Sequence, residues 1–133
     1  MSDNIDRNAV SDVEDLATAI IECAYNIHSA LGPGLDKGAY EEFLYYELER
    51  KSIPFETQVE VPLYYKDKKL DQSVTVDLMI DDSLMVDVKA VDSIEYTDRA
   101  SILTGVRLSG KKFGLLLNFN TVDMKEGIIR VPN

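Results

Sequence analysis

The sequence feature that most constrains the fold is a pair of apolar segments, residues 74–80 and 84–89, separated by three polar residues, 81–83. Both segments are rich in Val, Ile, Leu and Met, which is typical of β-strands. A three-residue connection between two such segments predicts an antiparallel hairpin in which Ile80 pairs with Leu84. That single pair fixes the register of the whole hairpin, and with it the face on which each side chain lies.

The predicted register places two acidic side chains opposite each other on one face of the hairpin. The other face is wholly apolar, with Leu78 facing Val86 and Val76 facing Val88, whereas the acidic face pairs Met79 with Met85, Asp77 with Asp87 and Thr75 with Lys89. The Cβ atoms of directly opposed residues lie about 4.5–5.5 Å apart, so the two carboxylates repel each other. Something must compensate for this repulsion, and a divalent cation is the obvious candidate.

A less specific interpretation of the acidic face stays open. The face could be solvated, with an ion pair between Lys89 and Asp87 and no bound cation. Met79 and Met85 argue against full solvation, because methionine side chains prefer to be covered. The spacing alone does not choose between a metal site and a solvated face.

Length and composition predict a single folded domain. The chain has 133 residues, of which 45% are hydrophobic, and we expect a flexible acidic leader at residues 1–10 followed by one domain at residues 11–133. It contains no apolar run of about 18 residues that could span a membrane, and no apolar signal core near its first residue. With Cys23 as the only cysteine, we expect a reduced, cytoplasmic protein. Whether it forms a homo-oligomer stays open.

The net charge of −10 bears on the partners that the chain can bind. Affinity for nucleic acid comes largely from Lys and Arg, so such an acidic chain is an unusual nucleic-acid binder. The charge is unevenly distributed, however, because lysines cluster at residues 66–69 and at residues 111–112. These lysines either form a local basic rim or are ordinary solvated turn residues, and the sequence does not decide between the two.

The remaining pattern predicts helices and strands in the order ααβββαββ. A capping box from Ser11 to Glu14 starts an amphipathic helix that ends at Gly32, and a second helix covers residues 39–51. The further elements are a strand at 58–65, in which Pro62 indicates an edge or a bulge, the two hairpin strands, a helix at 96–108, an apolar strand at 113–119 and a short strand at 127–131. This order predicts an α/β (α+β mixed) domain with one mixed sheet covered by helices.

Four side chains and one backbone carbonyl are the candidates for chemistry. Asp87 and Lys89 lie two residues apart on one strand and therefore share a face, which Asp77 also occupies. Two carboxylates and a strand carbonyl, that of Val88, can hold Mg²⁺ while several waters stay bound. Glu41 borders the apolar stripe of the second helix; it could add a third carboxylate, or it is a flanking surface glutamate.

His28 and Cys23 have simpler interpretations. His28 is the only histidine, which excludes a metal site with two or more histidine ligands and favours a hydrogen-bonded core residue. Cys23 has no partner in a recognisable motif, so we expect a packed thiol.

Asp77, followed by Asp87-Val88-Lys89 on the next strand, resembles the PD-(D/E)XK motif of the restriction-endonuclease-like nucleases. The wider sequence resembles one branch of that superfamily, the small bacterial and archaeal proteins of the GxxExxY family. The segments that carry this resemblance are residues 20–28, Leu31-Gly-Pro-Gly-Leu35, Tyr40-Glu41-Glu42, Val76-Asp-Leu78, Val86-Asp-Val-Lys-Ala90, Leu108-Ser-Gly110 and Leu116-Leu-Asn-Phe-Asn120. They cover nearly the whole chain from about residue 13 onward.

The resemblance implies a restriction-endonuclease-like αβββαβ core with an extra N-terminal helix. It also implies that Asp77 and Asp87 bind a metal, Mg²⁺ or Mn²⁺, and that Glu41 is the acid supplied by a helix. Lys89 would be the catalytic lysine that assists the attacking water. The implied activity is a nuclease that hydrolyses phosphodiester bonds in DNA or RNA.

Two positions depart from the family pattern. The family name describes a glutamate three residues after Gly34, but Lys37 occupies this position and reverses the charge. Relatives often carry a glutamine on the helix after the lysine strand, where this chain has Ser101. Together with the net charge of −10, these departures motivate a second hypothesis beside the preferred nuclease, in which the fold is catalytically degenerate and binds nucleic acid or protein.

Overall fold

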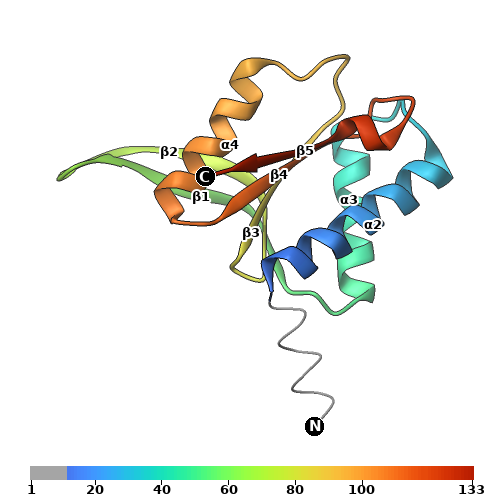
Figure 1. Ribbon diagram of the computed structural model, residues 1–133, viewed down its shortest axis with the longest axis horizontal. Helices are drawn as coiled ribbons and strands as arrows, with labels where there is room; N and C mark the ends of the chain where they lie inside the picture. Colours follow the sequence, from blue (N-terminus) through green and yellow to red (C-terminus); the bar gives the residue numbers. More distant parts are fainter. Residues whose placement is uncertain (1–11) are drawn as a thin grey trace, which may run out of the picture.

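The computed structural model describes residues 12–133 and confirms the predicted order of elements (Figure 1). The helices are α2 (Val13–Leu31), α3 (Lys37–Arg50), α4 (Tyr96–Ser109) and the short 3₁₀ helix η1 (Met124–Gly127); the strands are β1 (Phe55–Tyr65), β2 (Lys68–Ile80), β3 (Leu84–Lys89), β4 (Phe113–Asn118) and β5 (Ile128–Pro132). The largest difference from the predicted bounds is in β2, which begins at Lys68 rather than at residue 74.

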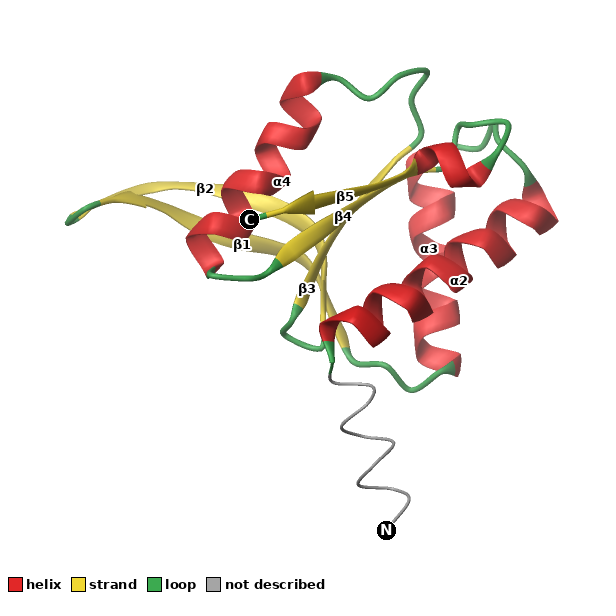
Figure 2. Ribbon diagram, in the orientation of Figure 1, coloured by secondary structure: helices red, strands yellow, loops and turns green. Residues whose placement is uncertain are grey.

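The strands form one mixed sheet in the order β1-β2-β3-β4-β5 (Figure 2). Neighbouring strands are antiparallel except for the central pair, β3 and β4, which is parallel. A parallel pair needs a long crossover connection, and α4 lies in the connection between these two strands. β4 is buried along its whole length, as its apolar sequence predicts. The mixed sheet with its helices confirms the predicted fold class.

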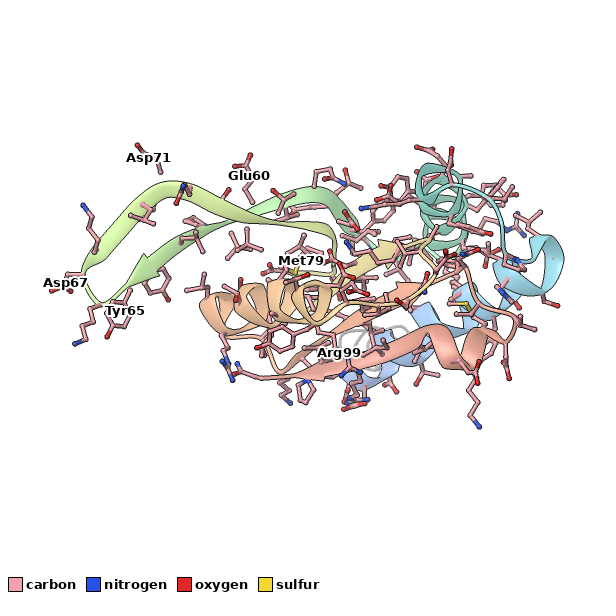
Figure 3. All side chains as sticks on the ribbon, turned by 90° about the horizontal axis from the view of Figure 1, so that it is seen from above. Glu60, Tyr65, Asp67, Asp71, Met79 and Arg99 are labelled. Atoms are coloured by element: carbon pink, nitrogen blue, oxygen red, sulfur yellow. The ribbon has the colours of Figure 1, made fainter. Side chains whose placement is uncertain are left out.

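β1 and the first part of β2 form a two-stranded ribbon that projects from the rest of the molecule (Figure 3). β1 is an edge strand, and its register with β2 shifts between Pro62 and Tyr64, which confirms the edge position and the irregularity predicted at Pro62. Tyr65, beside the turn at the tip of the ribbon, is 73% exposed. The tip therefore adds little to the core.

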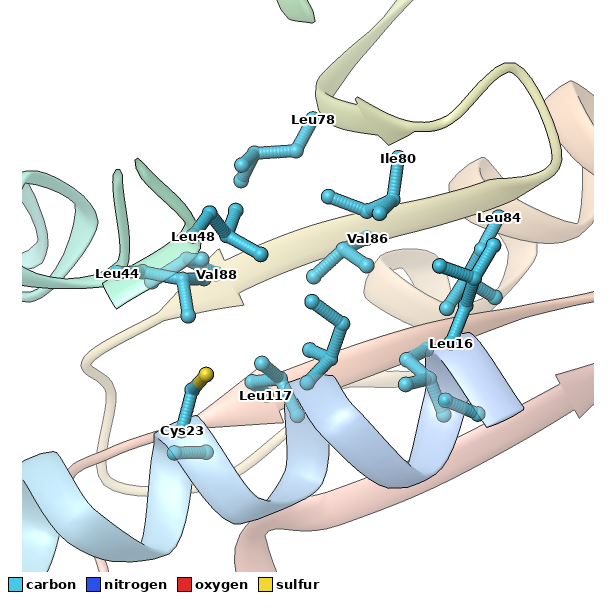
Figure 4. Packing of buried hydrophobic residues seen from close by; sticks show 14 of the residues in the cluster. Leu16, Cys23, Leu44, Leu48, Leu78, Ile80, Leu84, Val86, Val88 and Leu117 are labelled. Atoms are coloured by element: carbon cyan, nitrogen blue, oxygen red, sulfur yellow. The ribbon is translucent and has the colours of Figure 1, made fainter. Parts of the chain in front are cut away.

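Two hydrophobic clusters hold the helices on the two faces of the sheet. α2 and α3 pack on one face, where Leu78, Val86 and Leu117 are buried among apolar residues of both helices (Figure 4). α4 packs on the other face, over Met79 and Met85. Because both methionines are buried, the part of the acidic face next to the hairpin turn is covered rather than solvated.

The hairpin of β2 and β3 has the predicted register near its turn, with Leu78 paired to Val86, Met79 to Met85 and Ile80 to Leu84. The prediction that Val76 faces Val88 is wrong. Val76 packs in the cluster under α4, whereas Val88 lies in the cluster under α2 and α3. The regular pairing of β2 with β3 ends at Leu78, and β2 continues beside β1 alone. Two-stranded ribbons twist strongly, and this twist turns Val76 toward the other face.

The predicted leader at residues 1–10 and the predicted helix cap Ser11 lie outside the described residues. Within residues 12–133, Asp12 caps α2, because its carboxylate accepts a hydrogen bond from the Glu14 amide at 2.8 Å. Across the same range, no helix combines the length and the apolar character needed to cross a membrane.

His28 and Cys23 have the structural roles that the sequence predicts. His28 is half-buried, and its Nε2 lies 2.7 Å from the carbonyl oxygen of Thr121, so the ring ties α2 to the segment after β4. Cys23 is buried and free, and its burial raises the pKa of the thiol to about 11. Such a thiol stays protonated at neutral pH and acts as a packing group.

Candidate active site

The acidic face of the hairpin opens into a cavity of about 360 Å³. Its lining residues are Lys37, Gln58, Thr75, Asp77, Asp87, Lys89, Thr97, Asp98 and Ser101. The cavity therefore brings together three of the four predicted catalytic residues, Asp77 on β2 with Asp87 and Lys89 on β3. It is also lined by both positions that depart from the family pattern, Lys37 and Ser101.

Asp77 and Asp87 are not two free carboxylates in face-to-face repulsion. The amide of Asp77 donates a hydrogen bond to Asp87 Oδ1 at 2.9 Å, and the amide of Val88 donates one to Asp77 Oδ2 at 2.9 Å. Each carboxylate thus accepts an N–H group of the opposite strand, just beyond the point where the regular pairing of β2 and β3 ends. Both residues are buried, with exposed fractions of 6% and 7%. These charge-assisted bonds fix the two side chains and offset part of their repulsion.

Lys37, the first residue of α3, supplies a full positive charge next to these carboxylates. Its Nζ lies 3.0 Å from Oδ1 of Asp77 and 3.0 Å from Oδ2. Burial lowers the pKa of the Lys37 ammonium, but the hydrogen bond and the charge of Asp77 outweigh this effect and raise the pKa above its usual value. Lys37 is therefore charged at neutral pH and holds one of the two predicted metal ligands.

Gln58 is a second contact of Asp77, and the sequence pattern did not indicate it. The Gln58 Nε2 atom lies 3.4 Å from Asp77 Oδ1. Gln58 stands between Thr57 and Val59, which are both paired with β2, and its backbone φ is 50°. Such a φ is uncommon for a residue other than glycine, and strained backbone of this kind clusters at functional sites. The local backbone of β1 therefore turns an amide toward the cavity.

Glu41 lies one helical turn after Lys37 on α3 and is half-buried. Its Oε2 atom is buried and has no hydrogen-bond partner within residues 12–133. Burial raises the pKa of Glu41, and so does the charge of Asp77, whereas Lys37 lowers it. A buried oxygen without a partner costs free energy, so a cation or a proton at this atom would be stabilising.

The donor chemistry of this region fits a hard divalent cation, although the described conformation does not assemble a complete site. Burial raises the pKa of Asp87, and the hydrogen bond from the Asp77 amide lowers it only in part. Asp77, Asp87 and Glu41 thus offer carboxylate oxygens, the ligands that Mg²⁺ prefers. Within residues 12–133, however, no three His, Cys, Asp or Glu side chains are arranged to hold a metal ion. The ammonium of Lys37 contacts both oxygens of Asp77 instead.

Lys89 is held at the cavity by α4. Its Nζ lies 3.6 Å from Oδ1 of Asp98, and the Oδ2 atom of Asp98 accepts a hydrogen bond from the Glu95 amide as part of a capping box. The ion pair of Lys89 is therefore with Asp98, not with Asp87 as the solvated-face interpretation supposed. No sequence signal indicated this contact, because Glu95 and Asp98 differ from the Ser/Thr and Glu/Gln residues of the usual capping-box pattern.

Tyr40 fixes the start of α3, and with it the position of Lys37. Its hydroxyl donates a hydrogen bond to the Gly32 carbonyl at 2.6 Å and accepts one from the Leu35 amide at 3.2 Å. Its ring stacks on Phe119, just after β4, with ring centroids 4.5 Å apart. The loop between α2 and α3 is thus tied to the sheet, so that α3 begins at a defined place beside the cavity.

Replacing Glu41 with Gln is expected to change how stability depends on pH. Because the pKa of Glu41 is raised in the folded protein, the native state holds this proton more tightly than the unfolded chain does. The stabilising contribution is complete below the unfolded pKa of about 4.3 and is lost as the pH rises through the folded pKa. Glu41→Gln cannot ionise, so its free energy of unfolding should rise relative to the wild type as the pH increases from about 4 to about 7.

Urea unfolding of both proteins across this pH range measures the effect. The matched control is Glu49→Gln, which removes an exposed carboxylate from the same helix and should follow the wild-type pH profile. Parallel profiles for Glu41→Gln and the wild type would contradict the assignment of a buried, unsatisfied carboxylate.

Comparison with known proteins places nearly the whole described region in one family. A family model described as the PD-(D/E)XK nuclease superfamily matches residues 14–131. A comparison with curated proteins finds no match, and neither does a comparison with solved structures. The matched range includes Lys37, both carboxylates of the hairpin and Lys89. The chain therefore belongs to the PD-(D/E)XK nuclease superfamily.

Proposed function

We propose that this chain is a nuclease that uses Mg²⁺ or Mn²⁺ to hydrolyse phosphodiester bonds in DNA or RNA. The observation that carries the proposal is the cavity in which Asp77, Asp87 and Lys89 meet. Membership of the nuclease superfamily supports the activity class. The buried Oε2 atom of Glu41, which has no hydrogen-bond partner among residues 12–133, supports the binding of a cation near these carboxylates.

Each residue has a proposed role in hydrolysis. Asp77, Asp87 and the backbone carbonyl of Val88 would hold the cation, and Glu41 would add a third carboxylate. A bound divalent cation would lower the pKa of a water molecule and offset the charge that develops on the phosphoryl group. Lys89, oriented by Asp98, would position that water for attack. The water oxygen bonds to phosphorus as the bond to the leaving nucleotide oxygen breaks. One proton of the attacking water passes to solvent, and the leaving oxygen takes a proton from solvent.

We further propose that the chain belongs to the GxxExxY branch of the superfamily, on the segments identified in the sequence. In this branch assignment, Lys37 replaces the glutamate of the family name.

The buried free thiol of Cys23 supports a reducing compartment such as the cytoplasm.

The contact between Lys37 and Asp77 favours a second candidate function. If Lys37 permanently neutralises Asp77, the site needs no cation, and the fold would serve as a binding module for nucleic acid or protein. The two candidates differ in whether Asp77 is required for a metal-dependent reaction.

A cleavage assay separates the two candidates. Purified protein is incubated with single- and double-stranded DNA and RNA in the presence of Mg²⁺, of Mn²⁺ or of EDTA. We expect cleavage of at least one substrate with metal, no cleavage with EDTA, and a loss of about 100-fold or more in Asp77→Ala. Cleavage that survives in Asp77→Ala would contradict the proposed site. A wild-type protein that binds a nucleic acid but leaves it intact would favour the binding module.

A further inference from the structure

Lys37 lies at a position of its helix where the helix dipole disfavours a positive charge. It is the first residue of α3, directly after the capping residue Asp36, and the first turn of this helix contains no acidic residue. The partial positive charge at the start of a helix favours carboxylates and disfavours ammonium groups. The position of Lys37 is therefore explained by its partner across the cavity rather than by the helix that carries it.

That partner is Asp77, and the contact uses both of its carboxylate oxygens. The Lys37 Nζ lies 3.0 Å from each oxygen, and Asp77 is buried. Lys89, the other lysine of the cavity, is 3.6 Å from Asp98 and is oriented by α4. Lys37 is thus the ammonium group that directly neutralises Asp77 within residues 12–133.

We propose that Lys37 is a built-in competitor for the divalent cation at Asp77. This inference rests on the proposed function, in which Asp77 and Asp87 hold that cation. The ammonium occupies the oxygens of Asp77 in the metal-free protein, and it has to withdraw before a divalent cation binds, because two positive charges at one carboxylate repel each other. Lys37 thereby sets the metal affinity of the site and keeps it low.

The structure allows this withdrawal. The Lys37 side chain is 42% exposed, so its flexible stem can carry the ammonium into water without disturbing the core. Asp77 keeps its hydrogen bond from the Val88 amide, which holds the carboxylate in place when the ammonium leaves. Glu41, one turn further on α3, has a buried oxygen with no partner in the described part of the chain, and this oxygen would be stabilised by the arriving positive charge.

Competition predicts opposite effects of one substitution on metal affinity and on metal-free stability. Lys37→Gln removes the competing ammonium, so Mn²⁺ should bind about tenfold more tightly than it binds to the wild type, or more tightly still. The same substitution leaves Asp77 without its cation, so the metal-free variant should unfold at a lower temperature. Lys37→Glu should show both effects more strongly, because it adds a further carboxylate beside Asp77 and Glu41.

The experiment measures Mn²⁺ binding by isothermal titration calorimetry and thermal unfolding in EDTA for each purified variant. Lys37→Arg keeps the positive charge and should keep the low metal affinity of the wild type. Lys68→Gln is the matched control, because it removes an equal charge from the exposed end of β2 and should change neither quantity. If Lys37→Gln and Lys37→Glu do not fold in EDTA, thermal unfolding in increasing Mn²⁺ gives the test instead, because competition predicts that Mn²⁺ stabilises both variants at lower concentrations than it stabilises the wild type.

The outcomes distinguish this inference from the proposed function. Tighter Mn²⁺ binding by Lys37→Gln with lower metal-free stability supports the competition. Equal, measurable Mn²⁺ binding by the wild type and Lys37→Gln overturns the competition while the proposed metal site survives. Absence of Mn²⁺ binding in all variants overturns the competition and the metal site together.

Discussion

Replacing Asp87 with Asn is expected to remove the proposed nuclease activity while leaving the protein at least as stable as the wild type at neutral pH. Asn keeps the Oδ1 atom that accepts the hydrogen bond from the Asp77 amide. It lacks the negative charge that a cation ligand supplies, so we expect cleavage to fall by about 100- to 1,000-fold. Most single substitutions destabilise a protein. A gain in stability together with a loss of activity would therefore indicate a carboxylate that is kept for function at a cost in stability.

The expected stability follows from the raised pKa of Asp87. Burial is the main cause of this shift, which means that the native state favours the neutral form. The associated stability is present below the unfolded pKa of about 3.9 and is lost as the pH rises through the folded pKa. At neutral pH the wild type carries the cost of a buried charge, and Asp87→Asn does not.

Cleavage assays and urea unfolding in EDTA at neutral pH measure the two effects separately. Asp82→Asn is the matched control, because the Asp82 side chain is 95% exposed at the turn of the same hairpin and should affect neither quantity. A variant Asp87→Asn that unfolds at clearly lower urea than the wild type would show that the carboxylate stabilises the fold. A structural role would then explain why Asp87 is buried at this position, and this burial would no longer support a metal site.

Replacing Phe119 with Ala is expected to destabilise the protein by about 3–5 kcal/mol. Phe119 is fully buried, and its ring stacks on Tyr40 with centroids 4.5 Å apart. Its amide also donates a hydrogen bond at 2.9 Å to the carbonyl of Lys89, the last residue of β3. Removing the ring leaves a cavity between α3 and the sheet, at the contact that positions the start of α3.

Chemical unfolding of Phe119→Ala and of Phe43→Ala gives the comparison. Phe43 lies on α3 but is 43% exposed, so its replacement should cost far less, on the order of 1 kcal/mol or below. Phe119→Ala should also make the start of α3, and with it the position of Lys37, less ordered, because Tyr40 loses its stacking partner. Equal destabilisation by the two substitutions would contradict the proposed anchoring role of the Tyr40–Phe119 stack.

The hairpin and the placement of its two aspartates on one side could be predicted because they depend on local pattern and simple geometry. A three-residue turn fixes the pairs near Ile80 and Leu84, and the alternation of a strand then carries Asp77 and Asp87 to the same side. The same reasoning identified Lys89 and the need for positive charge near the carboxylates. These inferences needed only neighbours within a short stretch of chain.

The remaining features depend on contacts between distant segments and on twist. Val76 changes face because β2 parts from β3 and twists with β1, which the alternating pattern does not encode. Lys37 lies 40 positions before Asp77 in the chain, so the sequence shows its reversed charge but not its contact. Gln58 reaches the cavity through an unusual backbone conformation that its residue type does not predict. Tertiary geometry decided each of these positions.

The two edges of the sheet limit the ways in which this protein can meet a partner. The edge strands β1 and β5 each contain a proline, Pro62 and Pro132, which has no N–H group to offer to an added strand. The register shift beside Pro62 further interrupts the outer edge of β1. A missing N–H group weakens pairing with an added strand at these two positions, so strand addition is disfavoured beside Pro62 and Pro132. At these two places on the sheet, a partner of this fold should therefore be bound through side chains rather than through backbone hydrogen bonds.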